Sequence, residues 1–133
     1  METEAQHPEE EAKHPGEIVW CDLTVPHAET VRDFYRAVIG WSVTELGMGG
    51  YSDYCMNTPD TGKTVAGIVH ARGVNSDLPA QWLIYVKVTS LDDSMSAVRH
   101  NGGTVLTGPK PIPGGHYCVI QDPDGAVMAL IQN

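Results

Sequence analysis

The fold is decided by the stretch IVWCDLTVPHAETVRDFYRAVIG, residues 18–40, in which the spacing of the apolar residues changes once. Over residues 18–25 apolar residues alternate with others, a period of two that predicts a β-strand. Beyond Pro26 they recur at positions 31, 34, 35, 38 and 39, which predicts an amphipathic helix that Gly40 ends. We expect the apolar side of this helix, with Phe34 at its centre, to fill the space between helix and sheet.

The rest of the chain extends this unit and then repeats it. Three short strands are expected around residues 41–46, 52–57 and 64–71, separated by turns rich in Gly, Pro and Asp. A second unit follows, with a strand at 82–88 and a helix that begins after Ser90 as N-cap. Its last strands are expected near 104–106, 116–121 and 126–131. Each half therefore has the order β-α-β-β-β.

The two halves also repeat weakly in sequence, at a constant offset of 63 residues. The offset places Val25 on Val88 and Gly40 on Gly103, and it places the pair Tyr54-Cys55 on Tyr117-Cys118. A long fixed period of this kind indicates duplication of one supersecondary unit. We therefore expect two half-sheets that face each other around one cleft, with these Tyr-Cys pairs at matching places on matching strands and both thiols structural.

Length and charge limit the possible architectures and partners. The 133 residues suggest one domain over 16–133, with modules at 16–74 and 79–133 and an acidic, disordered leader at 1–15. The net charge of −9, with only eight scattered Lys and Arg residues, argues against a nucleic-acid partner. No apolar run approaches the roughly 20 residues of a membrane span. Three cysteines and the absence of a secretory signal favour a cytoplasmic protein.

Two motifs on this framework give the chain a family resemblance. They are the helix text DFYRAVIGW, residues 33–41, and the turn Asp122-Pro-Asp-Gly125 before the last strand. With the β-α-β-β-β repeat, these motifs resemble the vicinal oxygen chelate superfamily, which contains glyoxalase I, bleomycin-resistance proteins and extradiol dioxygenases. The resemblance covers residues 16–133. It implies an α+β fold in which two tandem βαβββ modules form a cupped mixed sheet with helices on the outer face.

The resemblance also implies where a metal would be held in the family's enzymes. Those positions, on the first and last strands of each module, are Trp20, Leu83, Ala129 and either Ala66 or Gly67. None of these side chains has a lone pair fit for metal coordination, since the indole nitrogen of Trp20 is a hydrogen-bond donor only. We therefore expect no metal and no cofactor, while the cup itself remains available to a ligand, as in the bleomycin-resistance branch.

Strand alternation suggests which side chains line that cup. If Trp20 points inward, Asp22 does too, and the equivalent strand of the second module contributes Tyr85 and Lys87. His116, after Gly114-Gly115, is the histidine placed best to touch a ligand. A simpler alternative is that Asp22 and Lys87 pair with each other or with backbone groups and only close a polar boundary.

These residues favour a metal-free protein that binds a small aromatic or amphipathic organic molecule, with Trp20, Asp22, Tyr85, Lys87 and His116 as contacts. The alternative is an enzyme, either a lyase or isomerase with Asp22 as general base or a dioxygenase-like enzyme with an unrecognised metal site. A third possibility is a structural role through a homodimer with an unused cup. We expect a homodimer in any case.

Overall fold

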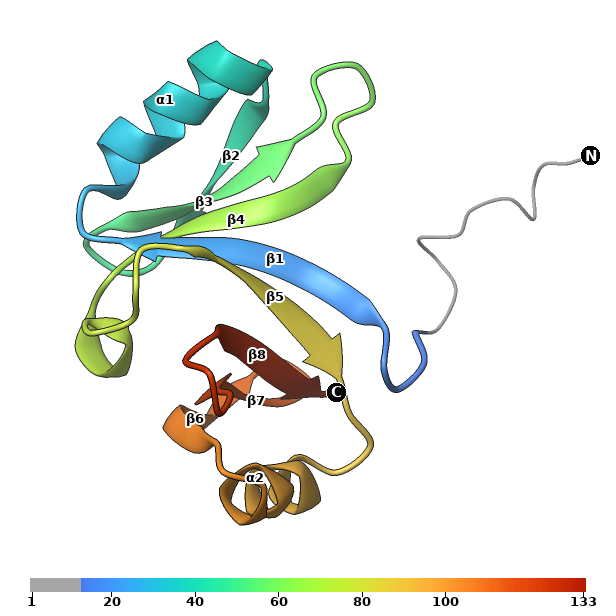
Figure 1. Cartoon of the computed structure of the whole chain (residues 1–133). Helices are drawn as coiled ribbons and strands as arrows, with labels where there is room; N and C mark the ends of the chain where they lie inside the picture. Colours follow the sequence, from blue (N-terminus) through green and yellow to red (C-terminus); the bar gives the residue numbers. More distant parts are fainter. Residues whose placement is uncertain (1–12) are drawn as a thin grey trace, which may run out of the picture.

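The computed structural model describes residues 13–133, which form two βαβββ modules in sequence (Figure 1). The first module consists of β1 (Ile18–Val25), α1 (Ala28–Ile39), β2 (Ser42–Gly47), β3 (Ser52–Asn57) and β4 (Thr64–His70). A short 3-10 turn, η3 (Gly73–Asn75), lies in the connection to the second module. That module consists of β5 (Trp82–Lys87), α2 (Leu91–His100), β6 (Thr104–Ile112), β7 (Gly115–Gln121) and β8 (Val127–Gln132).

All eight strands belong to one mixed sheet, in the order β2-β3-β4-β1-β5-β8-β7-β6. The modules join where β1 and β5 pair antiparallel, and within each module the first and last strands pair parallel. Helix α1 contacts β1 and β4, and α2 contacts β6, β7 and β8, on the outer side of the curved sheet (Figure 1). The α+β fold of two βαβββ modules expected from the sequence is confirmed.

Each helix covers a core on the outer side of its own module. Under α1, Ala28 packs with Leu23, Val25, Met56 and Ile68, all of them buried. Under α2, the core contains Leu91, Met95, Cys118 and Leu130. The residues predicted to end the first helix and to cap the second do so. Gly40 ends α1 in the left-handed conformation at φ 89°, and the Ser90 side chain accepts a hydrogen bond from the backbone N–H of Asp93.

The prediction that Phe34 fills the space between α1 and the sheet is wrong. Phe34 is 57% exposed and Val38 64% exposed, while Val31 and Tyr35 pack against the core instead. Tyr35 is fixed there because the Trp82 indole N–H donates a hydrogen bond of 3.1 Å to its hydroxyl. The apolar stripe of α1 is wider than the surface it covers, so one edge of it remains on the outside.

The constant repeat offset also fails in the structure. Asp22 pairs with Gly67 and Tyr85 pairs with Ala129, so Gly67, not Ala66, corresponds to Ala129. On the next strands Cys55 pairs with Gly67 as Val119 pairs with Ala129. A slip of one residue turns a side chain to the opposite face of a sheet.

The two Tyr-Cys pairs are therefore not equivalent, in contrast to the prediction. Tyr54 lies in the outer core beneath α1, whereas Tyr117 faces inward. Cys118 belongs to the outer core beneath α2, and Cys55 is only partly buried. The identities at an offset of 63 arise from residues that point in different directions.

Strand β6 is longer than the sequence predicts. It was expected to end near Leu106, before the prolines, but it continues to Ile112 with register shifts against β7. Proline is compatible with this position because β6 is an edge strand, where one side of the backbone has no ladder to complete. The extension carries Lys110 along the inner side of the sheet.

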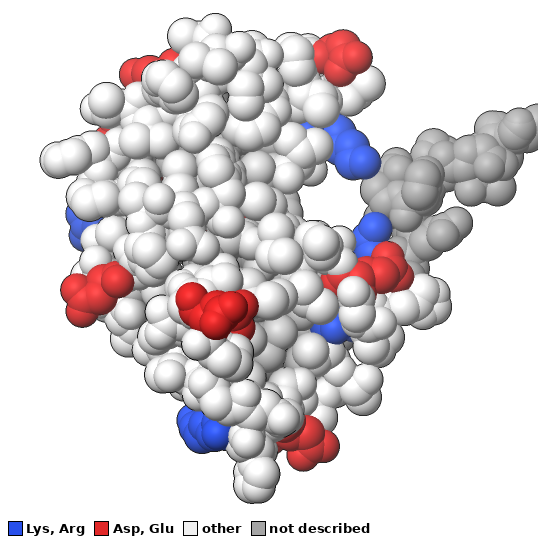
Figure 2. All heavy atoms as spheres, viewed as in Figure 1, with Lys and Arg blue, Asp and Glu red and all other residues white. Residues whose placement is uncertain are grey.

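Two surface properties complete the description. Within residues 13–133 no helix is both long enough and apolar enough to cross a membrane. On the face shown in Figure 2, a few charged side chains of both signs are scattered over a mostly uncharged surface. The predicted disordered leader at 1–15 falls, for residues 1–12, outside the described part of the chain.

Candidate ligand-binding cup

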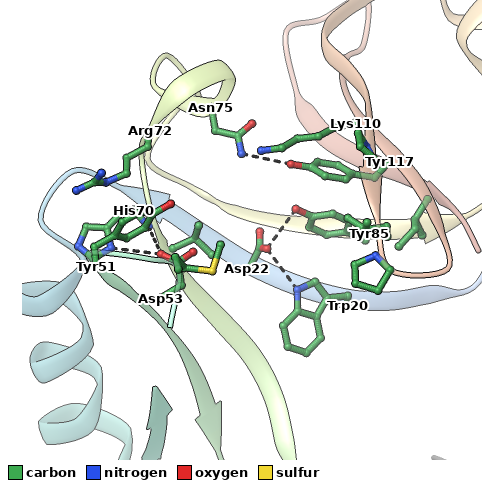
Figure 3. Close-up of a pocket in the computed structure, with 16 residues that line it drawn as sticks. Trp20, Asp22, Tyr51, Asp53, His70, Arg72, Asn75, Tyr85, Lys110 and Tyr117 are labelled. Carbon is green, nitrogen blue, oxygen red and sulfur yellow. Dashed lines mark hydrogen bonds and ion pairs between the residues drawn. The ribbon is translucent and has the colours of Figure 1, made fainter. Parts of the chain in front are cut away.

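The inner side of the sheet forms a cup of about 440 Å³ between the two modules (Figure 3). Four aromatic rings line it, from Trp20, Tyr51, Tyr85 and Tyr117. Apolar side chains occupy much of the remaining wall: Met48, Val69, Pro111, Ile112, Pro113 and Ile131. The polar groups are few, which is the usual composition of a small-molecule site.

Asp22 is the central polar group of the cup. It lies on β1 and is 9% exposed. Its Oδ2 accepts hydrogen bonds from the Trp20 indole at 3.3 Å and from the Tyr85 hydroxyl at 3.2 Å (Figure 3). Its Oδ1 is buried and has no hydrogen-bond partner among the described residues. One oxygen is thus held in place, and the other remains without a donor.

Burial controls the ionisation of this carboxyl group. Desolvation raises the pKa of Asp22 from 3.8 to about 6, against the opposing effect of the hydrogen bonds from Trp20 and Tyr85. The carboxylate of Asp53 adds a smaller upward contribution. Burial, followed by the nearby Asp22 charge, also raises the pKa of the Tyr85 hydroxyl. Asp22 therefore changes its charge close to neutral pH.

A second carboxylate enters the cup from β3. Asp53 is 6% exposed, and its Oδ1 accepts a hydrogen bond of 2.9 Å from the backbone N–H of His70. The same oxygen lies 3.3 Å from His70 Nδ1, while Nε2 on the other side of that ring lies 3.0 Å from Glu29. His70 thus links the wall of the cup to the first turn of α1.

Donor groups gather on the side of the cup opposite Asp22. Asn75, on η3, donates a 3.3 Å hydrogen bond to the Tyr117 hydroxyl oxygen. Lys110 lines the same region, and its ammonium points toward this pair in Figure 3. Arg72 lies at the edge, with its guanidinium carbon 3.7 Å from the centroid of the Tyr51 ring.

Three of the five residues predicted as ligand contacts meet in this cup, namely Trp20, Asp22 and Tyr85. Lys87 and His116 do not, because they line a separate surface depression with Thr89 and Gln132. Lys87 lies at the end of β5, and His116 alternates with the inward-facing Tyr117 and therefore points away from the cup. The suggested pairing of Asp22 with Lys87 is not formed, since the two residues line different hollows.

The sequence analysis did not identify the other polar groups of the cup. Asp53 could have been identified from the alternation of residues on its strand. On β3 the apolar Tyr54 and Met56 face the outer core, so Asp53 must face inward by alternation. His70 is the last residue of β4, and its position at a strand end does not by itself indicate a place in the cup. Nothing in the local sequence pointed to Lys110, because its strand was expected to end before it.

The cup does not fit the metal of the family's enzymes. No three His, Cys, Asp or Glu side chains between residues 13 and 133 form a group that could hold a metal ion. The positions that the resemblance assigns to the metal carry Trp20, Leu83, Ala129 and, as the register now fixes, Gly67. A methyl group at Gly67 would lie 3.2 Å from the Trp20 ring and 3.3 Å from Asp22 Cβ, so the indole occupies the space beside this glycine.

Comparisons with known proteins agree with this architecture. The family model described as Glyoxalase/Bleomycin resistance protein/Dioxygenase superfamily matches residues 17–130. The anthracycline biosynthesis protein DnrV of Streptomyces peucetius is 28% identical over 118 residues, which cover 89% of this chain and 42% of that protein. A relative from Mycobacterium tuberculosis is 23% identical over 130 residues, 88% of this chain and 44% of its own length. The chain thus spans less than half the length of these curated relatives.

Solved structures with the same fold include methylmalonyl-CoA epimerases. A variant of the Streptomyces coelicolor enzyme, in complex with 2-nitronate-propionyl-CoA, superposes with a TM-score of 0.57 at 16% identity. The match covers 90% of this chain and 96% of that one. The enzyme from Mycobacterium tuberculosis gives a TM-score of 0.53 at 11% identity and 95% coverage of both chains. At these identities the likeness shows the fold alone.

Proposed function

The chain belongs to the Glyoxalase/Bleomycin resistance protein/Dioxygenase superfamily, and on that premise we propose that it binds a flat, partly aromatic organic molecule in the cup without a metal ion. The observation that carries the proposal is the set of aromatic rings from both modules around a buried carboxyl group. Trp20 and Tyr85 are register partners on β1 and β5, so their side chains lie next to each other on the inner face of the sheet, and both donate to Asp22 Oδ2. Several aromatic rings lining one cavity favour a flat ligand, because its faces and edges can make stacking and edge contacts with them.

Two further observations support this ligand class. The cup volume of about 440 Å³ lies within the range of ordinary small-molecule sites. The relative from Streptomyces peucetius is named for anthracycline biosynthesis, and anthracyclines are fused-ring aromatic compounds. Asp22 Oδ1, a buried acceptor without a donor, would be satisfied by a hydroxyl or N–H group of such a ligand.

Binding can be tested with 1,4-dihydroxyanthraquinone as probe, measured by equilibrium dialysis so that the tryptophan variants need no fluorescence correction. We expect Trp20→Ala or Tyr85→Ala to weaken binding by ~1–3 kcal/mol while the circular dichroism spectrum stays unchanged. His116→Ala is the matched control, since His116 lies outside the cup. Unchanged affinity in both cup variants, or an equal loss in the control, would place the binding site elsewhere.

A second candidate function, an isomerase with Asp22 as general base, is favoured by one observation. The pKa of Asp22 is raised to about 6, close to the value that suits proton abstraction at neutral pH. The test is exchange of the α-hydrogens of 2-tetralone, an enolisable aromatic ketone, in D₂O, followed by NMR. Catalysed exchange should increase as Asp22 ionises around pH 6 and should be lost in Asp22→Asn. Exchange at the rate of buffer alone excludes this activity for that ketone class.

Self-association is the remaining part of the proposal. Phe34, Val38 and Ile39 expose 57%, 64% and 49% of their surface on α1, and a second copy of the chain would cover them. A second copy would also give the assembly about the length of the curated relatives. Light scattering after gel filtration should give twice the mass of the chain for the wild-type protein and the mass of a single chain for Val38→Glu. A wild-type protein that runs as a monomer contradicts this.

A further inference from the structure

We propose that the ligand carries an anionic oxygen, a carboxylate or an ionised phenol or enol, and that Lys110 and the Tyr117 hydroxyl bind it. This inference rests on the proposed binding function and adds the charge and orientation of the ligand. It concerns the side of the cup formed by β6, β7 and η3, where Lys110, Tyr117 and Asn75 meet (Figure 3).

Lys110 is a cation without a counter-charge among the described residues. It is half-buried on β6, where it pairs with Tyr117 of β7, and no carboxylate of residues 13–133 lies within ion-pair distance of it. In Figure 3 its ammonium is directed toward the Tyr117 hydroxyl and Asn75, at the interior of the cup. A half-buried ammonium interacts strongly with an anion that displaces water beside it.

Tyr117 provides a second donor at the same place. Its hydroxyl oxygen accepts the hydrogen bond from the Asn75 side-chain amide, so its own hydrogen remains free to be donated. No acceptor for that hydrogen exists among the described residues. The ring itself is fixed, being 8% exposed and 5.7 Å from the Tyr85 ring, centroid to centroid.

The free donors therefore lie on the side of the cup away from Asp22 Oδ1, and Asn75 Oδ1, beside Tyr117, is a second buried acceptor without a donor among the described residues. Lys110 and Tyr117 offer hydrogen-bond donors on one side, and Asp22 Oδ1 is an acceptor without a donor on the β1 side. A ligand satisfies both when an anionic oxygen faces Lys110 and a hydroxyl or N–H group faces Asp22. Hydroxylated aromatic acids and ionised hydroxyquinones have this arrangement on a flat ring.

The experiment compares two probes of nearly the same shape, the anionic 1-hydroxy-2-naphthoate and the neutral 1-hydroxy-2-naphthamide, by isothermal titration at pH 7.5. We expect the naphthoate to bind at least tenfold more tightly to the wild-type protein. Lys110→Met keeps the aliphatic stem and should weaken naphthoate binding about tenfold, with naphthamide binding changed less than twofold. Tyr117→Phe should weaken naphthoate binding severalfold. Lys87→Met is the matched control, a strand-end lysine outside the cup.

A third probe separates a carboxylate from an ionised phenol or enol. 1,4-Dihydroxyanthraquinone should bind more tightly as the pH is raised through its first ionisation, and Lys110→Met should remove this dependence. A preference for naphthoate alone assigns the site to carboxylates, and a pH-dependent gain for the quinone alone assigns it to phenolates or enolates. Either result supports an anion site.

The outcomes also distinguish this inference from the function on which it rests. If both naphthalene probes bind equally and the quinone shows no gain on ionisation, the anion site is wrong although the cup binds aromatic ligands. If no probe binds at all, the binding function is overturned together with it. If Lys110→Met fails to fold, the wild-type ratio of the two naphthalene affinities still decides, and Lys110→Gln provides a second variant.

Discussion

Replacing Asp22 by asparagine should make the stability of the protein less dependent on pH between about 4 and 6. In the folded protein the pKa of Asp22 is about 6 instead of 3.8, because the carboxyl group is buried. Over this interval the folded state binds more protons than the unfolded state, so the free energy of unfolding falls as the pH rises. The loss is complete once Asp22 is ionised in both states, at about one pH unit above its folded-state pKa of about 6.

The magnitude follows from the shift. A difference of about two pKa units at 1.36 kcal/mol per unit corresponds to about 3 kcal/mol of stability that ionised Asp22 removes. An amide cannot ionise, so Asp22→Asn should gain about this much relative to the wild type between pH 3.5 and pH 7.5. The new N–H group in place of Oδ1 has no acceptor, which lowers the stability of the variant by ~1–3 kcal/mol at every pH. The change of the difference with pH is therefore the quantity to measure.

Urea denaturation followed by circular dichroism at five pH values gives this quantity. Asp77→Asn, an exposed carboxyl group on the connection between the modules, is the matched control and should leave the pH dependence unchanged. Our reasoning about Asp22 is refuted if the stability difference between wild type and Asp22→Asn stays constant with pH. It is equally refuted if the variant becomes relatively less stable as the pH rises.

Three other predictions test the core, the cup and the metal. Phe34→Ala should lower the free energy of unfolding by less than about 1 kcal/mol, because the ring is mostly exposed. Ile68→Ala, in the core, should lower it by ~2–5 kcal/mol. Similar losses for the two variants in urea denaturation would contradict the placement of α1. Gly67→Ala should displace the Trp20 ring and weaken binding of 1,4-dihydroxyanthraquinone severalfold. Gly47→Ala is the control, because a methyl group there meets no other atom. Equal affinities of the two variants in dialysis would contradict the contact between Gly67 and Trp20. Treatment with EDTA should leave the thermal midpoint unchanged, and a drop of several degrees would reveal a bound ion.

The sequence predicts most of the fold because its strongest signals are local. The change of period after Pro26, the Ser90 cap and the Gly40 stop each act within a few residues, and the structure reproduces them all. Which residues of a helix are buried depends instead on contacts with distant parts of the chain. Phe34 and Tyr35 are consecutive aromatic residues on the apolar side of one helix. The width of the sheet beneath them decides which of the two is buried.

The site is predicted less completely because it depends on register between strands. Alternation on a single strand correctly brings Trp20 and Asp22 together, and the first-strand equivalence correctly adds Tyr85. The same equivalence also predicts Lys87, which lines a different hollow, and His116, expected in a loop beside the cup, lies on β7 next to the inward-facing Tyr117 and points away. Lys110 depends on an edge strand that passes through two prolines, which a pattern of strand-forming residues does not reveal.

The separation of the helix-covered cores from the inner face has a consequence for how such proteins evolve. On β1, β3 and β4 the residues that anchor the fold, such as Leu23, Met56 and Ile68, alternate with those that line the cup, such as Asp22 and Asp53. Mutations at lining positions such as Asp22 and Asp53 change what is recognised without removing a residue from the cores beneath the helices, whereas Tyr85, Tyr117 and Ile131 line the cup and also form a core of their own. A lineage can therefore acquire new ligands through single substitutions, each starting from a folded ancestor, and the duplicated architecture gives it two walls that diverge independently.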